Sequence, residues 1–95
     1  MEKVFVVLYG HSEYCGFDIF GGAFKTLQSA LEHAQSRRKK WYNEVLTKQE
    51  GNVTYVLPLK SDDEDYESKR NEFEFDYDQM TYYNGGYIIM ETEVK

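Results

Sequence analysis

The chain has 95 residues, 41% of them hydrophobic and 17% aromatic, and its 17 acidic and 11 basic residues give a formal net charge of −6. A chain of this length buries roughly 60 to 70% of its unfolded surface, so we expect a single domain over residues 1–95. The aromatic content excludes a disordered chain, and the lone Cys15 excludes an intramolecular disulfide. With no run near the roughly 20 apolar residues of a membrane span, and no signal-peptide cleavage site after residues 1–9, we expect a cytoplasmic protein without a membrane partner.

The N-terminal part of the chain predicts a β-hairpin. Lys3–Tyr9 is a continuous β-branched and aromatic run, typical of a central strand buried on both faces. A loop of about six residues then leads to a second short strand, Phe17–Phe20, which the glycines at 21–22 should end.

A long amphipathic helix should follow the hairpin. Thr26 is suited to the N-cap, Phe24 can pack back on the first turn, and Gly51 is suited to the C-terminal end. We therefore expect one helix over residues 27–49, with an exposed far end. Its apolar stripe would consist of Leu27, Ala30, Leu31, Ala34, Trp41 and Val45.

The next segment predicts a strand and then a loop. Val53–Leu59 has strand composition, and Pro58, which lacks an amide donor, should lie at a sheet edge or near the end of the strand. Residues 61–71 are rich in acids and poor in apolar side chains, so we expect a mobile acidic loop.

The last part of the chain predicts a second hairpin. Residues 72–78 alternate between acids and aromatics, typical of a half-buried strand with its carboxylates outward. Asn84, Gly85 and Gly86 should form a tight turn, and residues 87–94 the return strand. The fold class is therefore α+β: a mainly antiparallel sheet of about five strands with one long amphipathic helix on one face, in the order β-β-α-β-β-β.

Candidate catalytic and metal-binding residues are few. His11, Glu13 and Cys15 alternate in the first loop and could offer three ligands to a metal, with His33 as a fourth. The same loop holds a thiol and a histidine, but their spacing matches no established nucleophile signature. We therefore expect no catalytic residue, no metal site and no cofactor, and a protein that is not an enzyme.

Two other motifs point to nucleotide or nucleic-acid binding only superficially. The glycine pairs at 21–22 and 85–86 lack the spacing of a phosphate-binding loop. The basic cluster Arg37–Lys40 precedes Trp41 and Tyr42, but four consecutive helical residues spread around the whole helix, and most of the surface is acidic. We therefore expect no direct contact with nucleic acid.

The acidic C-terminal part is the most unusual feature. Between Asp62 and Glu93, eleven acids and two bases give a local charge of −9, which leaves +3 for the rest of the chain. On a strand, the carboxylates at 72, 74, 76 and 78 would lie about 6.7 Å apart, close to two base steps of DNA. Glu91 and Glu93 on the neighbouring strand and the acidic run at 62–67 could supply the further carboxylates that imitation of DNA requires. Such a face should attract a cationic partner.

Small size, many tyrosines and the acid runs at 62–67 and 72–78 resemble the small acidic proteins of phages and prophages. In particular, the chain resembles host-takeover and anti-defence inhibitors that occupy nucleic-acid channels of host enzymes as DNA mimics. The resemblance implies an inhibitor that works in the host cytoplasm. The basic residues at 37–40 depart from an all-acidic mimic.

We therefore expect a non-enzymatic binding protein whose acidic face engages a basic surface of a host protein, such as a nucleic-acid-binding defence enzyme. The alternative is a small structural or self-associating domain, a homodimer for example, whose acidic face serves solubility alone. The predicted partner-binding residues are Asp62, Asp63, Glu64, Asp65, Glu67, Glu72, Glu74, Asp76, Asp78, Tyr82 and Tyr83.

Overall fold

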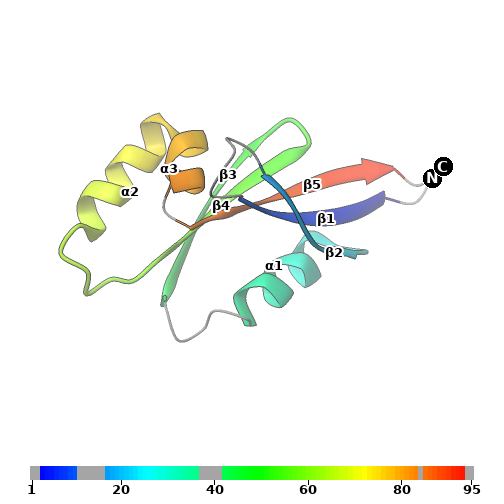
Figure 1. Ribbon diagram of the computed structural model, residues 1–95, viewed down its shortest axis with the longest axis horizontal. Helices are drawn as coiled ribbons and strands as arrows, with labels where there is room; N and C mark the ends of the chain where they lie inside the picture. The colour runs from blue at the N-terminus through cyan, green and yellow to red at the C-terminus, as the bar shows by residue number, and fades with distance from the viewer. Residues whose placement is uncertain (1–2, 11–16, 37–41, 84, 94–95) are drawn as a thin grey trace.

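A computed structural model describes residues 3–10, 17–36, 42–83 and 85–93 (Figure 1). The elements in chain order are β1 (Lys3–Gly10), β2 (Phe17–Phe24), α1 (Leu27–Ser36), β3 (Glu44–Glu50), β4 (Val53–Leu59), α2 (Tyr66–Phe75), α3 (Tyr77–Tyr83) and β5 (Tyr87–Glu93). The strands form one antiparallel sheet in the order β2-β1-β5-β4-β3. The predicted α+β class with a five-stranded antiparallel sheet is confirmed, but the described helices are three short ones rather than one long one.

The N-terminal hairpin forms as predicted, because β1 and β2 pair antiparallel. β1 lies between β2 and β5, so it is an interior strand, although β5 occupies the middle of the sheet. The predicted end of the second strand is wrong, since β2 continues through a register shift to Phe24. Gly21 permits this path because a Cβ there would lie 2.3 Å from the Tyr9 ring.

The helix that follows begins where predicted and ends much earlier. Thr26 caps α1, since its Oγ1 accepts a hydrogen bond of 3.0 Å from the Ser29 amide. α1 ends at Ser36, and residues 44–49, predicted as the last turns of the helix, belong to β3. Gly51, with φ of 61°, belongs to a two-residue hairpin turn to β4. A glycine with positive φ suits a helix end and a hairpin turn equally, so it did not discriminate between them.

Pro58 lies next to the last residue of β4, as its missing amide donor predicts. The strand is nevertheless interior, with β3 on one side and β5 on the other. Its pairing with β5 covers only Val53–Val56, so Pro58 lies beyond that ladder and opposes Val45 of β3.

The acidic segment differs most from its prediction. Residues 61–71 contain the first turns of α2 rather than a loop alone, and residues 72–78 form the end of α2 and the start of α3 rather than a strand. The aromatics do alternate, but Tyr66, Phe73 and Tyr77 are also spaced by seven and four residues, as on one helix face. A helix also separates the carboxylates that a strand would hold in one row.

The predicted hairpin turn at 84–86 is instead the link from α3 to β5. Asn84 lies outside the described residues, and Gly85 has φ of 77°. The Gly86 amide donates to the Thr81 carbonyl at 2.7 Å, and a Cβ on Gly86 would lie 2.4 Å from the Val56 carbonyl oxygen. This close approach brings the end of α3 against β4.

Each face of the sheet has its own core. On one face, Ala30 and Ala34 of α1 pack with Val7, Val56 and Ile89. On the opposite face, α2 and α3 cover the β3 and β4 edge of the sheet (Figure 1). This second core consists of Leu57, Leu59, Phe73 and Met80, with Leu46, Tyr55, Tyr66 and Tyr77 packed against it.

The described helices are too short and too polar to cross a membrane.

Candidate functional site

The candidate site is the acidic surface, which we define as residues 62–78, carrying nine acids and two bases. It comprises the turn after β4, all of α2 and the start of α3. The turn is closed by backbone hydrogen bonds from Asp63 to Lys60 (3.1 Å) and from Tyr66 to Asp63 (3.2 Å). The carboxylates of the turn therefore have a defined local backbone rather than a mobile loop.

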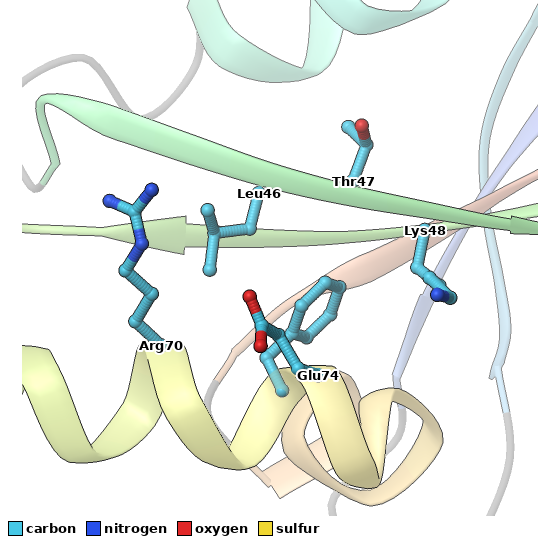
Figure 2. Close-up of a pocket in the computed structure, with 6 residues that line it drawn as sticks. Leu46, Thr47, Lys48, Arg70 and Glu74 are labelled. Carbon is cyan, nitrogen blue, oxygen red and sulfur yellow. The ribbon is translucent and has the colours of Figure 1, made fainter.

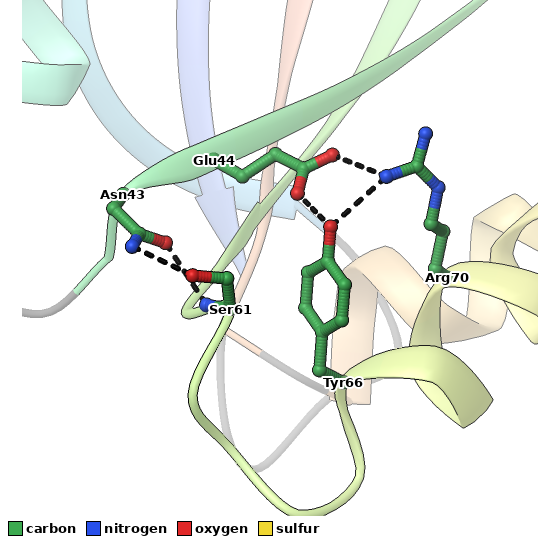
Figure 3. Close-up of polar contacts among 5 residues, drawn as sticks. All are labelled: Asn43, Glu44, Ser61, Tyr66 and Arg70. Carbon is green, nitrogen blue, oxygen red and sulfur yellow. Dashed lines mark hydrogen bonds and ion pairs between the residues drawn. The ribbon is translucent and has the colours of Figure 1, made fainter.

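A polar cluster fixes α2 against the edge strand β3 (Figure 3). The Tyr66 hydroxyl donates to the Glu44 carboxylate, and Arg70 lies 2.7 Å from Glu44 and 2.9 Å from the Tyr66 oxygen. The hydrogen bond to Tyr66 and then the Glu44 charge raise the pKa of Arg70. Arg70, one of the two basic residues of the acidic surface, is thus already engaged by contacts within the fold.

A second contact fixes the start of the acidic turn (Figure 3). The Asn43 side chain donates to the Ser61 hydroxyl at 2.8 Å and accepts from the Ser61 amide at 2.9 Å. Because Asn43 immediately precedes β3, the same edge of the sheet holds both the turn and α2.

The step from α2 to α3 is also tied to the sheet. Asp76 caps α3, because its Oδ1 accepts from the Gln79 amide at 3.3 Å. The Tyr77 hydroxyl donates a hydrogen bond to the Glu50 carboxylate. This hydrogen bond, and then burial, raise the pKa of Tyr77 to about 12. The Tyr77 ring packs on Tyr55 with centroids 4.8 Å apart, and burial and then the charges of Asp78 and Glu50 raise the Tyr55 pKa.

Most carboxylates of the acidic surface lack a cationic neighbour. Asp65 pairs with Lys69 at 3.3 Å, and Asp62 lies 4.0 Å from Lys60. Among the nine acids of the acidic surface, all of them described by the structure, six exposed carboxylates have neither a Lys or Arg nitrogen within 4.0 Å nor a hydrogen bond such as the one that Asp76 accepts from Gln79. These six, the unpaired carboxylates, are Asp63, Glu64, Glu67, Glu72, Glu74 and Asp78.

The unpaired carboxylates do not form the straight row that the strand prediction required. At about 100° per helical residue, Glu72 and Glu74 point roughly 200° apart around α2. Glu91 and Glu93 belong to the last part of β5, and the C-terminal end of β5 points away from α2 (Figure 1). Glu91 pairs there with Lys3 at 3.5 Å, so these two carboxylates do not extend the acidic surface. The helices therefore do not present carboxylates at the spacing of about 6.7 Å that the predicted imitation of DNA required.

Glu74 points into a groove of about 440 Å³ between α2 and β3 (Figure 2). Leu46 and Phe73 supply its apolar part, and Lys48 and Arg70 its basic part. The Lys48 ammonium lies 6.0 Å from the Tyr77 ring centroid. This groove was not predicted from the sequence, because residues 44–49 were expected to be helical rather than part of an edge strand.

The structure also exposes an aromatic side chain that the strand prediction placed inward. Phe75, at the end of α2, is 89% exposed, whereas Phe73 is 4% exposed. A helical wheel of residues 66–80 would have separated these two rings. Of the predicted aromatic contacts, Tyr82 is half-buried, and the Tyr83 side chain lies outside the described residues.

The predicted metal candidates His11, Glu13 and Cys15 also lie outside the described residues. Among the residues that are described, no three His, Cys, Asp or Glu side chains gather as a metal site would require. His33 is exposed, and its ring packs on Phe24 with centroids 4.8 Å apart.

Comparison with protein-family models, with curated proteins and with solved structures finds no match to this chain. The functional argument therefore depends on the charges and contacts described above.

Proposed function

We propose that the protein is a non-enzymatic inhibitor, encoded by a phage or another mobile element, whose acidic surface engages a basic site of a host protein. The partner would be a nucleic-acid-binding enzyme such as a defence enzyme. The observation that carries this proposal is the group of six unpaired carboxylates on α2, α3 and the preceding turn. Like charges held together without counter-charges favour a cationic partner and accelerate its encounter.

The exposed ring of Phe75 supports the same proposal. A large apolar side chain that is 89% exposed gains little from the fold, but can fill a pocket in a partner. Glu72 lies one helical turn before Phe75, so a carboxylate and the ring share one side of α2. An apolar anchor bordered by charge is typical of binding surfaces.

The rigidity of the acidic surface supports it further. The Glu44, Tyr66 and Arg70 cluster and the Asn43 to Ser61 contact hold α2 and its leading turn on the sheet. A partner therefore meets carboxylates whose backbone is already ordered, which lowers the entropy cost of binding.

A capture experiment with two matched variants tests the proposal. Glu67→Gln combined with Glu72→Gln removes two unpaired carboxylates, whereas Glu32→Gln combined with Glu93→Gln removes two exposed carboxylates outside the acidic surface. We expect wild type and the second variant to retain a nucleic-acid-binding protein from a host lysate, and the first variant to lose it. Duplex DNA should displace the captured protein.

Equal capture by both variants, or retention that duplex DNA does not disturb, would contradict the proposal. The acidic surface would then serve solubility alone.

A further inference from the structure

Among the residues that the structure describes, the sheet ends at two edge strands, β2 and β3, and these edges differ in charge. β3 carries Glu44, Lys48 and Glu50, the kind of side chains that protect an edge from pairing with another chain. β2, with the sequence FDIFGGAF, contains one charged residue, Asp18. Of the two edges, β2 is therefore the one with fewer charged side chains to oppose pairing, and the register shifts in its pairing with β1 leave Phe20 in the ladder opposite Leu8.

Large apolar side chains are exposed on both faces of this edge. Ile19 is 44% exposed and Phe20 is 67% exposed. Ile19 opposes Tyr9, which packs against the core beneath α1, so Ile19 lies on the α1 face. Phe20 opposes Leu8 and lies on the opposite face. A free strand edge with apolar groups on both faces favours pairing with another strand.

The surface beside Phe20 is also apolar. α2 and α3 cover the β3 and β4 edge of their face (Figure 1). On the same face, Val4, Val6 and Leu8 of β1 and Met90 of β5 are only half-buried. Phe20 thus continues an apolar surface that runs inward from the free edge.

We infer that β2 pairs with β2 of a second copy of this chain, which joins two sheets into one of ten strands. Phe20 is near the middle of β2, so an antiparallel two-fold pairing centred there opposes Phe20 to Phe20 of the second copy. The same register places Ile19 opposite Gly21 of the second copy, where no side chain obstructs it. Residues that oppose each other then share a face, as a continuous sheet requires.

The charge distribution favours a second copy as the occupant. The acidic surface lies over β3 and β4, at the sheet edge opposite to β2. Pairing through β2 places the two acidic surfaces at the outer ends of the dimer, where their repulsion is smallest and both stay accessible. The dimer is therefore compatible with the proposed function and independent of it.

Sedimentation velocity of the full chain over a wide concentration range tests the inference, with Phe20→Lys as the variant and Phe75→Lys as the matched control. Both variants replace an exposed Phe by the same cation, and only Phe20 lies on the β2 edge. We expect wild type and Phe75→Lys to dimerise, and Phe20→Lys to dimerise about a hundredfold more weakly or not at all. Unchanged far-ultraviolet circular dichroism shows that each variant is folded.

Amide hydrogen exchange identifies the contact. The β2 amides should become more protected as the wild-type concentration rises, and those of β3 should not. A wild type that is monomeric throughout, or a Phe20→Lys variant that dimerises normally, would overturn the inference. The inference would also be overturned if wild type were monomeric and captured a partner that Phe20→Lys did not capture. The β2 edge would then pair with a strand of another protein. Glu67→Gln with Glu72→Gln should leave dimerisation intact, so the two proposals fail separately.

Discussion

Phe73 and Phe75 give the sharpest test of the helix that carries the acidic surface. Phe73 is 4% exposed and packs with Leu57, Leu59 and Met80, whereas Phe75 is 89% exposed. Phe73→Ala should lower the free energy of unfolding by about 3–5 kcal/mol, since it removes a buried ring and leaves a cavity. Phe75→Ala should change it by less than about 0.5 kcal/mol.

Urea unfolding followed by circular dichroism measures both changes. With a slope of about 1–3 kcal/mol per molar urea, Phe73→Ala should lower the midpoint by about 1 M or more, and Phe75→Ala by less than about 0.5 M. A half-buried strand over 72–78 would instead place both rings inward. Equal destabilisation by the two substitutions would therefore refute the helical assignment of α2.

Three further substitutions test other contacts. The pKa of Tyr77 is raised from 10.0 to about 12, so the neutral phenol should contribute its full stabilisation below pH 10 and lose it as the pH rises towards 12. In thermal unfolding, Tyr77→Phe should remove this alkaline loss of stability, and an unchanged pH profile would argue against the Glu50 contact. In urea unfolding, Gly86→Ala should lower the free energy of unfolding by about 3 kcal/mol, because the new Cβ meets the Val56 and Thr81 carbonyl oxygens. Gly85→Ala, in open space at φ of 77°, should lower it by about 1 kcal/mol, and equal losses would contradict the close approach at Gly86. Thr26→Ala should cost about 1 kcal/mol by the same assay through loss of the α1 cap, and no loss would contradict that cap.

Features determined by adjacent residues were predictable from the sequence. The β1 to β2 hairpin follows from two apolar runs separated by a short polar segment, and the start of α1 from Thr26 followed by helical spacing. The strands at 53–59 and 87–93 follow from their β-branched and aromatic content. Each of these signals extends over a few residues and has one structural interpretation.

The remaining elements depended on patterns with two interpretations. Gly51 suits both a helix end and a hairpin turn. The strand β3 was not predicted, because Val45 also fitted the apolar stripe of the expected helix. Residues 66–80 have both an alternating and a helical arrangement of aromatics, and the choice depends on contacts with Glu44 and Glu50, distant in sequence. The identities of the acidic residues at the candidate site were predictable, but their arrangement on two helices was not.

The most direct test of the acidic surface is the affinity of the captured partner for wild type and the two matched glutamine variants at increasing salt. The account predicts that Glu67→Gln with Glu72→Gln binds at least about tenfold more weakly at low salt and depends less on salt than wild type. Glu32→Gln with Glu93→Gln should behave as wild type. Equal affinity and equal salt dependence for all three proteins would contradict a role for the acidic surface in binding.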